Sequence, residues 1–542
     1  MIYLDIETNL KHDTMWLNVT KMYEEVIHWR AHLDLQAYLD GNKLVAHNGI
    51  GFDYPLLRQL WGVKIRKQQA IDTLIMSRLL NPVIEGGHSL KAWGKRLGVE
   101  KLEFDVTDFD AGYTPEMATY CERDVYLLEK LHKHLEAEFS YWPDAGIKPL
   151  ELEHEVAIIL SRMERTGFKL DIDRVQAMEI ETVGEMDDIE SEMQAIFPPI
   201  TEQRISEKTA KRLKDKVTVF NPGSRKQIAE RLEALGVDFD KVTDKGNIVI
   251  DDVVLNSIDI PEAKVLARYF WLQKRHGLVK SWLKAVKDDG RVHGRINSLG
   301  AVTNRCTHSS PNMGQIPSAK ECREVWITEK GYTLVGADLA GIELRCLAHY
   351  MKDPQYTKAL LEGDIHTTNQ EAAGLPERAM AKTFIYALLY GAGPAKLGSI
   401  VGGGADEGAK LLSKFMRAIP KLKKLIIKVK RLSKCGTITA LDGRLIQVRS
   451  EHSALNMLLQ AAGAIVAKQW LVESQRQVVK QGLNARLVAF VHDETQWECA
   501  DRDVDKLKAL LVQASLTAGE ALGFRLPVES AASSGKSWAD TH

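Results

Sequence analysis

The sequence predicts an α+β protein of several domains, and three observations support this. The chain has 542 residues, which is more than one domain usually contains. Apolar runs of strand length end in acidic residues at the start of the chain, in MIYLDIET, and in its second half, in YTLVGADL and LVAFVHDE. Long amphipathic segments typical of helices lie between these runs. An apolar fraction of 45% is enough to build large cores.

Composition excludes several classes of protein. No run of about 18 apolar residues is present, so no membrane span is expected. A carboxylate motif lies within the first seven residues, so the start of the chain does not read as a signal peptide, and a cytoplasmic location is expected. The six cysteines are scattered without C-x2-C spacing, which predicts reduced thiols and neither a zinc site nor a disulfide framework.

The first 130 residues carry an ordered set of acids. A strand predicted in MIYLDIET contains Asp5 and Glu7, and the strand in KLVAHNGIGFD leads to Asp53. TPEMATYCERDVYLLEKL predicts a helix capped by Thr114, with Tyr120 and Asp124 one turn apart. Four acids from separate elements can bind two metal ions, and a tyrosine can orient a water for attack on phosphate. D-x-E by itself is weak, since it occurs by chance in many surface strands.

Two further acids end predicted strands in the second half of the chain. YTLVGADLAGIELR predicts a strand that ends at Asp338, followed by a helix start that carries Glu343. LVAFVHDETQWEC predicts a hairpin with Asp493 at its tip. If these strands are neighbours, the two carboxylates repel each other unless a divalent cation such as Mg²⁺ lies between them. The alternative is that each Asp is an ordinary turn residue or helix cap.

A helix is predicted within PERAMAKTFIYALLYGAG, with Pro376 in its first turn and Gly391 at its exit. Residues at a spacing of four form a stripe along one face, and here two cations are followed by two aromatic rings. Cations neutralise a polyphosphate and rings stack on a base or sugar, which suits a nucleoside triphosphate. The alternative is an amphipathic helix with solvated cations and core tyrosines. The stripe consists of Arg378, Lys382, Tyr386 and Tyr390.

Positive charge is segregated although the net charge is only −1. Residues 204–231 hold nine Lys or Arg against three Asp or Glu, and residues 421–434 hold seven and none. Asn221 to Ser224 predict a turn that opens a helix, where backbone N–H groups can hold a phosphate. A DNA-binding chain of near-zero net charge needs such segregation. The alternative for both stretches is a solvated helix face.

In order and spacing, the segments around Asp338, Arg378 and Asp493 resemble motifs A, B and C of family A DNA polymerases. The set D-x-E, N-x3-F-D and Y-x3-D resembles the three motifs of DEDD-type 3′–5′ exonucleases. Longer segments, among them LDGRLIQVRSEHSALNMLLQAAGA, resemble the replicative polymerases of T-seven-type short-tailed bacteriophages. The likeness runs over the whole chain and is thinnest between about 180 and 285.

The resemblance implies an RNase H-like exonuclease domain at 1–145, followed by a right-hand polymerase. The thumb and connecting helices take 146–289, and palm and fingers take 290–542, with the fingers at about 351–440. The implied function is template-directed DNA synthesis with proofreading, in phage genome replication. A repair polymerase and a non-catalytic DNA-binding relative stay open as alternatives. A single-subunit RNA polymerase has a similar motif order, but the exonuclease motifs and Glu343 favour DNA.

The resemblance also implies a role for each matched residue. Two Mg²⁺, for which Mn²⁺ can substitute, are expected on Asp338, Asp493 and the backbone carbonyl of Leu339, and two more on Asp5, Glu7, Asp53 and Asp124. Tyr120 orients the water. Arg378, Lys382 and His366 bind the dNTP phosphates, Tyr386 packs on the sugar, Glu343 closes the ribose 2′ position and bonds Tyr386, and Tyr390 stacks near the template base. Primer–template contacts are expected from Arg305, Gln315, Gln460, His492, Asn221 and Ser224.

The chain departs from the family pattern at two places. The family's T-G-R is Thr303-Asn304-Arg305 here, and Asn tolerates positive φ better than most residues. Phage relatives carry a thumb insertion that binds thioredoxin, whereas only 213 residues separate Asp124 from Asp338 here, which leaves no room for it. We therefore expect a monomer that binds primer–template DNA and dNTPs without thioredoxin or a membrane. A phage helicase–primase and a single-strand binding protein are candidate partners.

Overall fold

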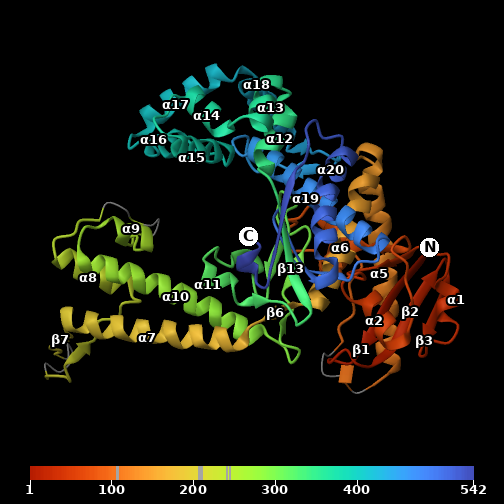
Figure 1. The fold of residues 1–542 in the computed structure, drawn as a ribbon. Coiled ribbons are helices and arrows are strands. Elements are labelled where there is room, and N and C mark those ends of the chain that lie inside the picture. Colours follow the sequence, from red (N-terminus) through yellow and green to blue (C-terminus); the bar gives the residue numbers. More distant parts are fainter. Residues whose placement is uncertain (105–108, 111, 206–210, 240–241, 243–245) are drawn as a thin grey trace. The chain divides into compact units, whose positions relative to one another are not determined.

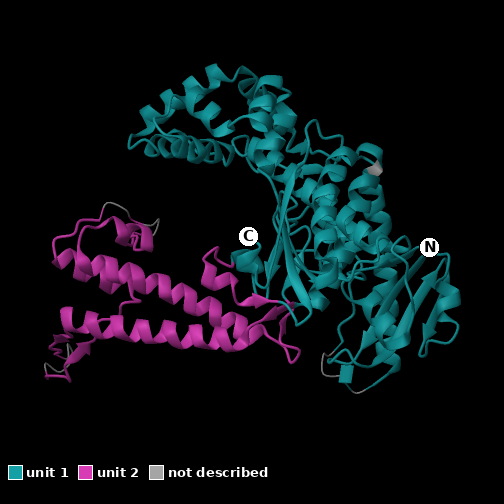
Figure 2. Ribbon diagram, in the orientation of Figure 1, with its two compact units in different colours: residues 1–167, 294–315, 328–542 teal, residues 168–293, 316–327 magenta. Residues whose placement is uncertain are grey.

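The computed structural model describes residues 1–104, 109–110, 112–205, 211–239, 242 and 246–542. These residues form two compact units (Figure 2). Unit 1 comprises 1–167, 294–315 and 328–542, and unit 2 comprises 168–293 and 316–327. Part of the basic stretch predicted at 204–231, residues 206–210, lies outside the described residues.

A mixed five-stranded sheet forms the N-terminal part of unit 1, in the order β3-β2-β1-β4-β5 (Figure 1). Strand β1 pairs antiparallel with β2 and parallel with β4. The predicted cap of the long helix α5 is confirmed, since Thr114 Oγ1 accepts from the Met117 N–H at 3.1 Å. The strands are β1 (Ile2–Thr8), β2 (Met15–Met22), β3 (Glu25–Trp29), β4 (Leu44–Ala46) and β5 (Ala70–Asp72). The helices are α1 (Leu35–Leu39), α2 (Asp53–Trp61), α3 (Thr73–Leu80), α4 (Leu90–Arg96) and α5 (Pro115–Phe139).

A four-stranded antiparallel sheet lies further along unit 1, in the order β16-β17-β13-β18. Asp338 is opposite Glu494 across β13 and β17, so the strand ending at Asp338 and the predicted hairpin are indeed neighbours. The strands are β13 (Tyr332–Leu339), β16 (Ala485–Val491), β17 (Glu494–Ala500) and β18 (Ser530–Gly535). Helices α12 (Ile342–Met351), α19 (Ala454–Lys480) and α20 (Val504–Ala521) belong to the same core.

Helix α6 (Ile147–Thr166) joins the cores of these two sheets. Leu152, Val156 and Leu160 are buried in the core of the antiparallel sheet, whereas Leu150 and Ile158 pack against the core of the mixed sheet. Helix α6 is therefore part of unit 1. The segment expected as thumb and connecting helices, 146–289, is divided between the two units at residue 168.

A helical layer occupies residues 354–432 of unit 1. One boundary prediction is wrong: α15 begins at Arg378 with Glu377 as its N-cap, so Pro376 lies before the helix. Tyr390 is its C-cap, and Gly391 leaves the helix with φ of 81°. The helices are α13 (Pro354–Glu362), α14 (Ile365–Ala373), α15 (Arg378–Leu389), α16 (Pro394–Ser399), α17 (Ala405–Ala418) and α18 (Pro420–Leu432). Short strand pairs are β14 (Thr437–Thr439) with β15 (Leu445–Gln447), and β10 (Arg295–Asn297) with β11 (Thr307–Ser309).

Unit 2 is mainly helical, with α7 and α10 running side by side (Figure 1). Unit 2 also contains a small antiparallel sheet of three strands, in the order β12-β6-β9. Its helices are α7 (Ile172–Ile196), α8 (Arg225–Ala234), α9 (Asp252–Ser257), α10 (Pro261–Ala285) and α11 (Lys320–Arg323). Its strands are β6 (Phe168–Leu170), β7 (Ile200–Glu202), β8 (Lys216–Thr218), β9 (Arg291–Val292) and β12 (Trp326–Ile327).

The sequence predicts reduced cysteines and no membrane span, and the structure bears on both points. All six cysteines are free thiols, and Cys435 is exposed while the other five are buried or half-buried. Among the described residues, no helix is both long enough and apolar enough to span a bilayer.

Candidate active sites

The end of the antiparallel sheet brings Asp338 and Asp493 together. Asp338 is the penultimate residue of β13, and Asp493 lies in the turn between β16 and β17. The Leu339 N–H donates to the Asp493 carbonyl at 3.1 Å, which fixes the turn to the end of β13. The neighbouring His492 has φ of 58°, so the hairpin turns sharply at this point. The residues matched to motifs A and C thus share one sheet end.

The two carboxyl groups are destabilised in their ionised form. Loss of hydration, and then repulsion by Asp493, Glu494 and Glu343, raises the pKa of Asp338 to about 7. Loss of hydration, and then repulsion by Glu343, raises the pKa of Asp493 to about 6. Such a concentration of acids is characteristic of a cation site, because a divalent ion removes the repulsion.

Glu343 is held at this site by two partners. Arg305 pairs with its carboxylate at 3.1 Å, and the Tyr390 hydroxyl donates to it at 3.1 Å. Among the described residues we find no hydrogen bond from Tyr386 to Glu343, so the contact implied by the resemblance stays a prediction, and Tyr390 is the tyrosine that contacts Glu343 here. The reason is that Tyr390 lies at the C-cap of α15, where the backbone leaves the helix and turns its ring toward α12. Tyr386 instead lies beside His366, with ring centroids 6.3 Å apart.

The cations of the α15 stripe differ in their surroundings. Arg378 is exposed and pairs with Asp364, the N-cap of α14, at 2.5 Å. This guanidinium keeps the pKa of Asp364 far below its usual range. Lys382 is exposed, and within the described part of the chain we find no ion pair to it. His366 follows Asp364, and loss of hydration together with the nearby Arg378 lowers its pKa.

Four further residues of unit 1 were predicted to contact primer–template: Arg305, Gln315, Gln460 and His492. Arg305, His492 and Asp493 line one small cavity together with Gly463 and Lys468 of α19. Gln460 is half-buried one turn earlier on α19, and Gln315 is exposed in a single 3₁₀ turn at Met313–Gln315. None of these contacts with DNA is tested by the geometry, so they stay predictions.

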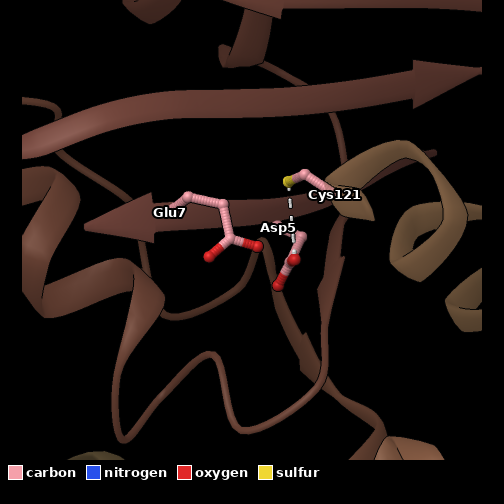
Figure 3. Close-up of side chains that lie close together, drawn as sticks. All are labelled: Asp5, Glu7 and Cys121. Atoms are coloured by element: carbon pink, nitrogen blue, oxygen red, sulfur yellow. Dashed lines mark hydrogen bonds between the residues drawn. The ribbon is translucent and has the colours of Figure 1, made fainter. Parts of the chain in front are cut away.

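The N-terminal sheet holds a second set of acids. Asp5 and Glu7 lie two residues apart on β1 and therefore on one face of the strand. Figure 3 shows the Glu7 carboxylate next to that of Asp5, and the thiol of Cys121 on α5 donates to Asp5 Oδ2 at 3.5 Å. One ligand atom from each of the three lies within 4.8 Å of the other two.

Asp53 and Asp124 join this set from two further helices. Asp53 is buried at the start of α2 and Asp124 is buried on α5. Burial, and then repulsion by Asp124, raises the pKa of Asp5 to about 7, while burial and then Asp5 raise that of Asp53 well above its usual value. Burial, and then Asp5 and Asp124, raises the pKa of Glu7 to about 9. The four predicted acids thus form one electrostatically coupled cluster.

A cation also occupies this cluster, and sequence reasoning missed it. Lys101 forms an ion pair with Asp124, and its Nζ lies 4.6 Å from the centre of the Tyr120 ring. Nothing in the pattern around Lys101 distinguishes it from a surface lysine. Cys121 was also missed, since all cysteines were expected to be reduced thiols without a role. Its position between Tyr120 and Asp124 on the predicted helix was the signal that could have placed it near the acids.

The donor set of both sites suits hard divalent cations. Carboxylate oxygens dominate each site, and Mg²⁺ prefers oxygen ligands. In the N-terminal cluster the Asp124 Oδ1 atom is buried and has no hydrogen-bond partner among the described residues, so it can serve as a ligand. At the other site, the exposed carboxyl of Asp338 leaves room for ligands supplied by a substrate.

The predicted turn at 221–224 is confirmed in unit 2. Asn221 Oδ1 accepts from the Gly223 N–H at 2.8 Å, and Ser224 is the N-cap of α8. Arg225 donates to the Ile250 carbonyl at 3.0 Å, and both Arg225 and Lys226 are exposed. The second basic stretch forms α18, where Lys421, Lys423 and Lys428 are exposed. Phosphate binding by either stretch remains a prediction.

Comparison with known proteins gives consistent results. The family model for DNA polymerase family A matches residues 199–540. The DNA-directed DNA polymerase of Escherichia phage T7 is 30% identical over 710 aligned positions that cover 100% of both chains. That of Enterobacteria phage T3 is also 30% identical, over 94% of this chain and 95% of its own. The phage T7 alignment is longer than this chain, so the phage protein has segments without a counterpart here.

A solved structure with the same fold is the POL domain of Pol1 from M. smegmatis in complex with DNA primer-template and dNTP. It superposes with a TM-score of 0.84 at 18% identity and covers 99% of this chain and 95% of its own. At this identity the likeness concerns the fold.

Proposed function

Because this chain belongs to DNA polymerase family A and is a DNA-directed DNA polymerase, we propose that Asp338 and Asp493 form its synthetic centre and that its N-terminal acids perform 3′–5′ proofreading. The observation that carries the first part is the meeting of the two carboxyl groups at one sheet end, with raised pKa values. The observation that carries the second part is the coupled cluster of four acids on β1, α2 and α5.

In the synthetic centre, Asp338, Asp493 and the Leu339 carbonyl hold the divalent ions. Two such ions, when bound, activate the primer 3′-hydroxyl and neutralise the triphosphate. Arg378, Lys382 and His366 bind the phosphates, for which Arg378 exchanges the exposed Asp364 for a phosphate oxygen. Tyr386 packs on the sugar, and Tyr390 lies near the template base. Glu343, fixed by Arg305 and Tyr390, closes the space beside the sugar 2′ position.

In the N-terminal cluster, Asp5, Glu7, Asp53 and Asp124 hold the ions. Mg²⁺ is our proposal for both sites, two ions in each, with Mn²⁺ as a substitute. Tyr120 orients the attacking water through its hydroxyl. Lys101 pairs with Asp124 beside the Tyr120 ring, so it would supply positive charge next to the ions and to the phosphate of the cleaved nucleotide.

The proposed ligands are primer–template DNA and dNTPs, and the proposed setting is phage genome replication in the cytoplasm of a bacterial host. Gln315, Gln460 and His492 are proposed to contact primer–template from unit 1, and Asn221 and Ser224 from unit 2, which we propose as the thumb. We further propose that the chain works as a monomer without thioredoxin, with a phage helicase–primase and a single-strand binding protein as candidate partners; the phage T7 relative has segments without a counterpart here, which is compatible with the absence of a thioredoxin-binding insertion.

A pair of variants tests the assignment of the two activities. The double variant Asp5→Ala, Glu7→Ala should stop digestion of a labelled primer with a mismatched 3′ end, while extension of a matched primer continues. Asp13→Ala, an exposed acid of the same region, serves as the control and should retain both activities. Continued digestion by the double variant would place the exonuclease elsewhere in the chain.

A further inference from the structure

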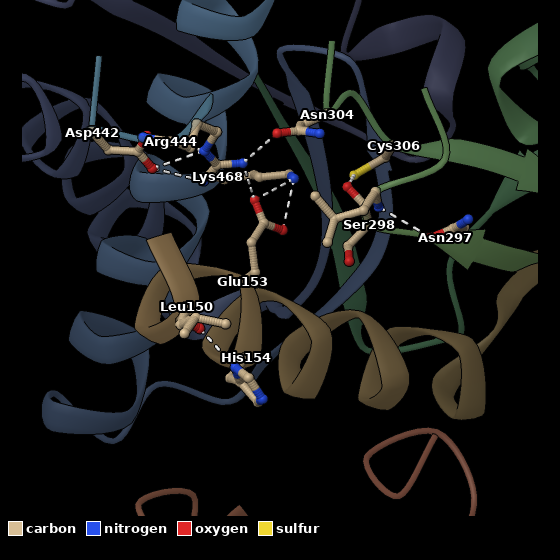
Figure 4. A network of polar contacts seen from close by, with 11 residues as sticks. Leu150, Glu153, His154, Asn297, Ser298, Asn304, Cys306, Asp442, Arg444 and Lys468 are labelled. Atoms are coloured by element: carbon tan, nitrogen blue, oxygen red, sulfur yellow. Dashed lines mark hydrogen bonds and ion pairs between the residues drawn. The ribbon is translucent and has the colours of Figure 1, made fainter. Parts of the chain in front are cut away.

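A cluster of charged side chains is fully buried in unit 1 (Figure 4). Glu153 of α6 accepts hydrogen bonds from Arg444 at 2.6 Å and from Lys468 of α19 at 2.7 and 2.8 Å. Arg444 also donates from Nη2 to Asp442 at 2.7 Å. All four side chains are at most 3% exposed. Two carboxylates therefore balance two cations, and the guanidinium of Arg444 is held in a fixed orientation.

Arg444 makes one further contact, to a neutral residue. Its Nη1 donates to Asn304 Oδ1 at 3.1 Å, as Figure 4 shows. Asn304 is 1% exposed and has φ of 56°, in the left-handed region that only Gly, Asn and Asp adopt readily. The Asn304 N–H donates to the Ala301 carbonyl at 2.8 Å, and the Ala301 N–H donates to the Arg305 carbonyl at 3.2 Å. A closed turn thus runs from Ala301 to Arg305.

The turn ends at a residue of the polymerase site. Arg305 pairs with Glu343 at 3.1 Å and lines a cavity together with His492 and Asp493. The direction in which Arg305 leaves the turn depends on the backbone of the residue before it. A change of φ at Asn304 would therefore swing the guanidinium of Arg305 away from Glu343.

We propose that Asn304, clamped by Arg444, is a positioning residue that holds Arg305 against Glu343 during DNA synthesis. Glycine at this place permits the same φ but offers no acceptor, so the turn is free to adopt other conformations. Asparagine supplies both the left-handed backbone and the acceptor for Arg444. This inference rests on the proposed contact of Arg305 with primer–template.

The test compares Asn304→Gly and Asn304→Asp, each with Arg305 intact and with Arg305→Ala. The readouts are Kd for primer–template, kcat and KM for single-nucleotide incorporation, and Tm for folding. Loss of one hydrogen bond to a charged group should weaken primer–template binding or lower kcat/KM by about tenfold in Asn304→Gly. Asn304→Asp keeps the acceptor but adds a third carboxylate to the buried cluster, so its Tm is measured first; in folded protein, Kd and kcat/KM should stay within about twofold of the unchanged protein.

The Arg305→Ala background separates a positioning role from a structural one. If Asn304 acts through Arg305, Asn304→Gly should have no further effect on kcat/KM or Kd once Arg305 is absent. Wild-type kinetics in Asn304→Gly would overturn the clamp, and so would an undiminished loss in the Arg305→Ala background. If Arg305→Ala alone leaves binding and incorporation unchanged, the proposed role of Arg305 fails, and the clamp has nothing to position.

Discussion

Replacing Glu7 by glutamine should make the metal-free protein more stable. The carboxyl of Glu7 is buried on β1 beside Asp5 and Asp124, and its pKa rises from 4.5 to about 9. At pH 7.5 it therefore carries a proton in the folded chain and loses that proton on unfolding. Glutamine has nearly the same shape and needs no proton to be neutral, so the cost of keeping this group protonated disappears.

The size of the effect follows from the pKa shift. Between pH 4.5 and pH 7.5 the folded state binds a proton that the unfolded state has released, and each pH unit costs about 1.4 kcal/mol. The ceiling at pH 7.5 is thus about 4 kcal/mol. Because the pKa of Glu7 is higher in the folded state, this group lowers the stability of the metal-free protein least near or below pH 4.5. The protein then loses stability as the pH rises toward 9, and Glu7→Gln should show a shallower slope, because Asp5 and Asp53 keep their own raised pKa values.

Thermal unfolding and amide hydrogen exchange of β1, both in EDTA across this pH range, measure the difference. Glu24→Gln is the matched control, because Glu24 is exposed in the same domain and should leave the stability unchanged. Added Mg²⁺ should stabilise the unchanged protein more than Glu7→Gln, which has lost a ligand. A Glu7→Gln protein that is less stable in EDTA, or one whose stability falls with pH as steeply as that of the unchanged protein, would refute the reasoning.

Three further outcomes are expected. Asp338→Asn or Asp493→Asn should abolish synthesis while 3′ digestion persists, and near-normal incorporation in Mg²⁺ would contradict the assignment of the synthetic centre. Tyr386→Phe should reject dideoxynucleotides at least about tenfold more strongly than the unchanged protein, since a bond from its hydroxyl to the charged triphosphate is worth about 1.5–3 kcal/mol; equal ddNTP-to-dNTP ratios would argue against this. In trapped primer extension, products should shorten steeply as salt rises, because phosphate contacts release counterions. Added thioredoxin should not lengthen them, and a large gain would reveal a clamp-binding segment.

Much of the arrangement was predictable because it depends on local pattern. The apolar runs that end at Asp338 and surround Asp493 are strands β13, β16 and β17, and they pair as expected. Strand β18 was not predicted, because SAASSG lacks the alternation of apolar residues and owes its conformation to pairing with β13. The start of α15 was misjudged, since Pro376 was expected in its first turn, whereas Glu377 is the N-cap and the helix begins at Arg378.

Contacts between distant segments could not be predicted. Glu153 meets Arg444 and Lys468 across about 300 residues, and no spacing rule links such positions. Lys101 likewise enters the acidic cluster from a loop whose pattern is that of a surface segment. The choice of Tyr390 over Tyr386 as partner of Glu343 depends on how the backbone leaves α15, which periodicity alone does not describe.

Helix α6 determines where the chain can be shortened. One side of it completes the core of the mixed sheet, while the other side carries Glu153 into the core of the antiparallel sheet. A polymerase trimmed to begin at Phe168, the first residue of unit 2, would lose both Glu153, the carboxylate that Arg444 and Lys468 share, and the apolar residues of α6 that complete the core of the antiparallel sheet. A trimmed polymerase that begins just before Ile147 keeps the helix and its charge. The N-terminal sheet is therefore removable only if its last connecting helix stays behind.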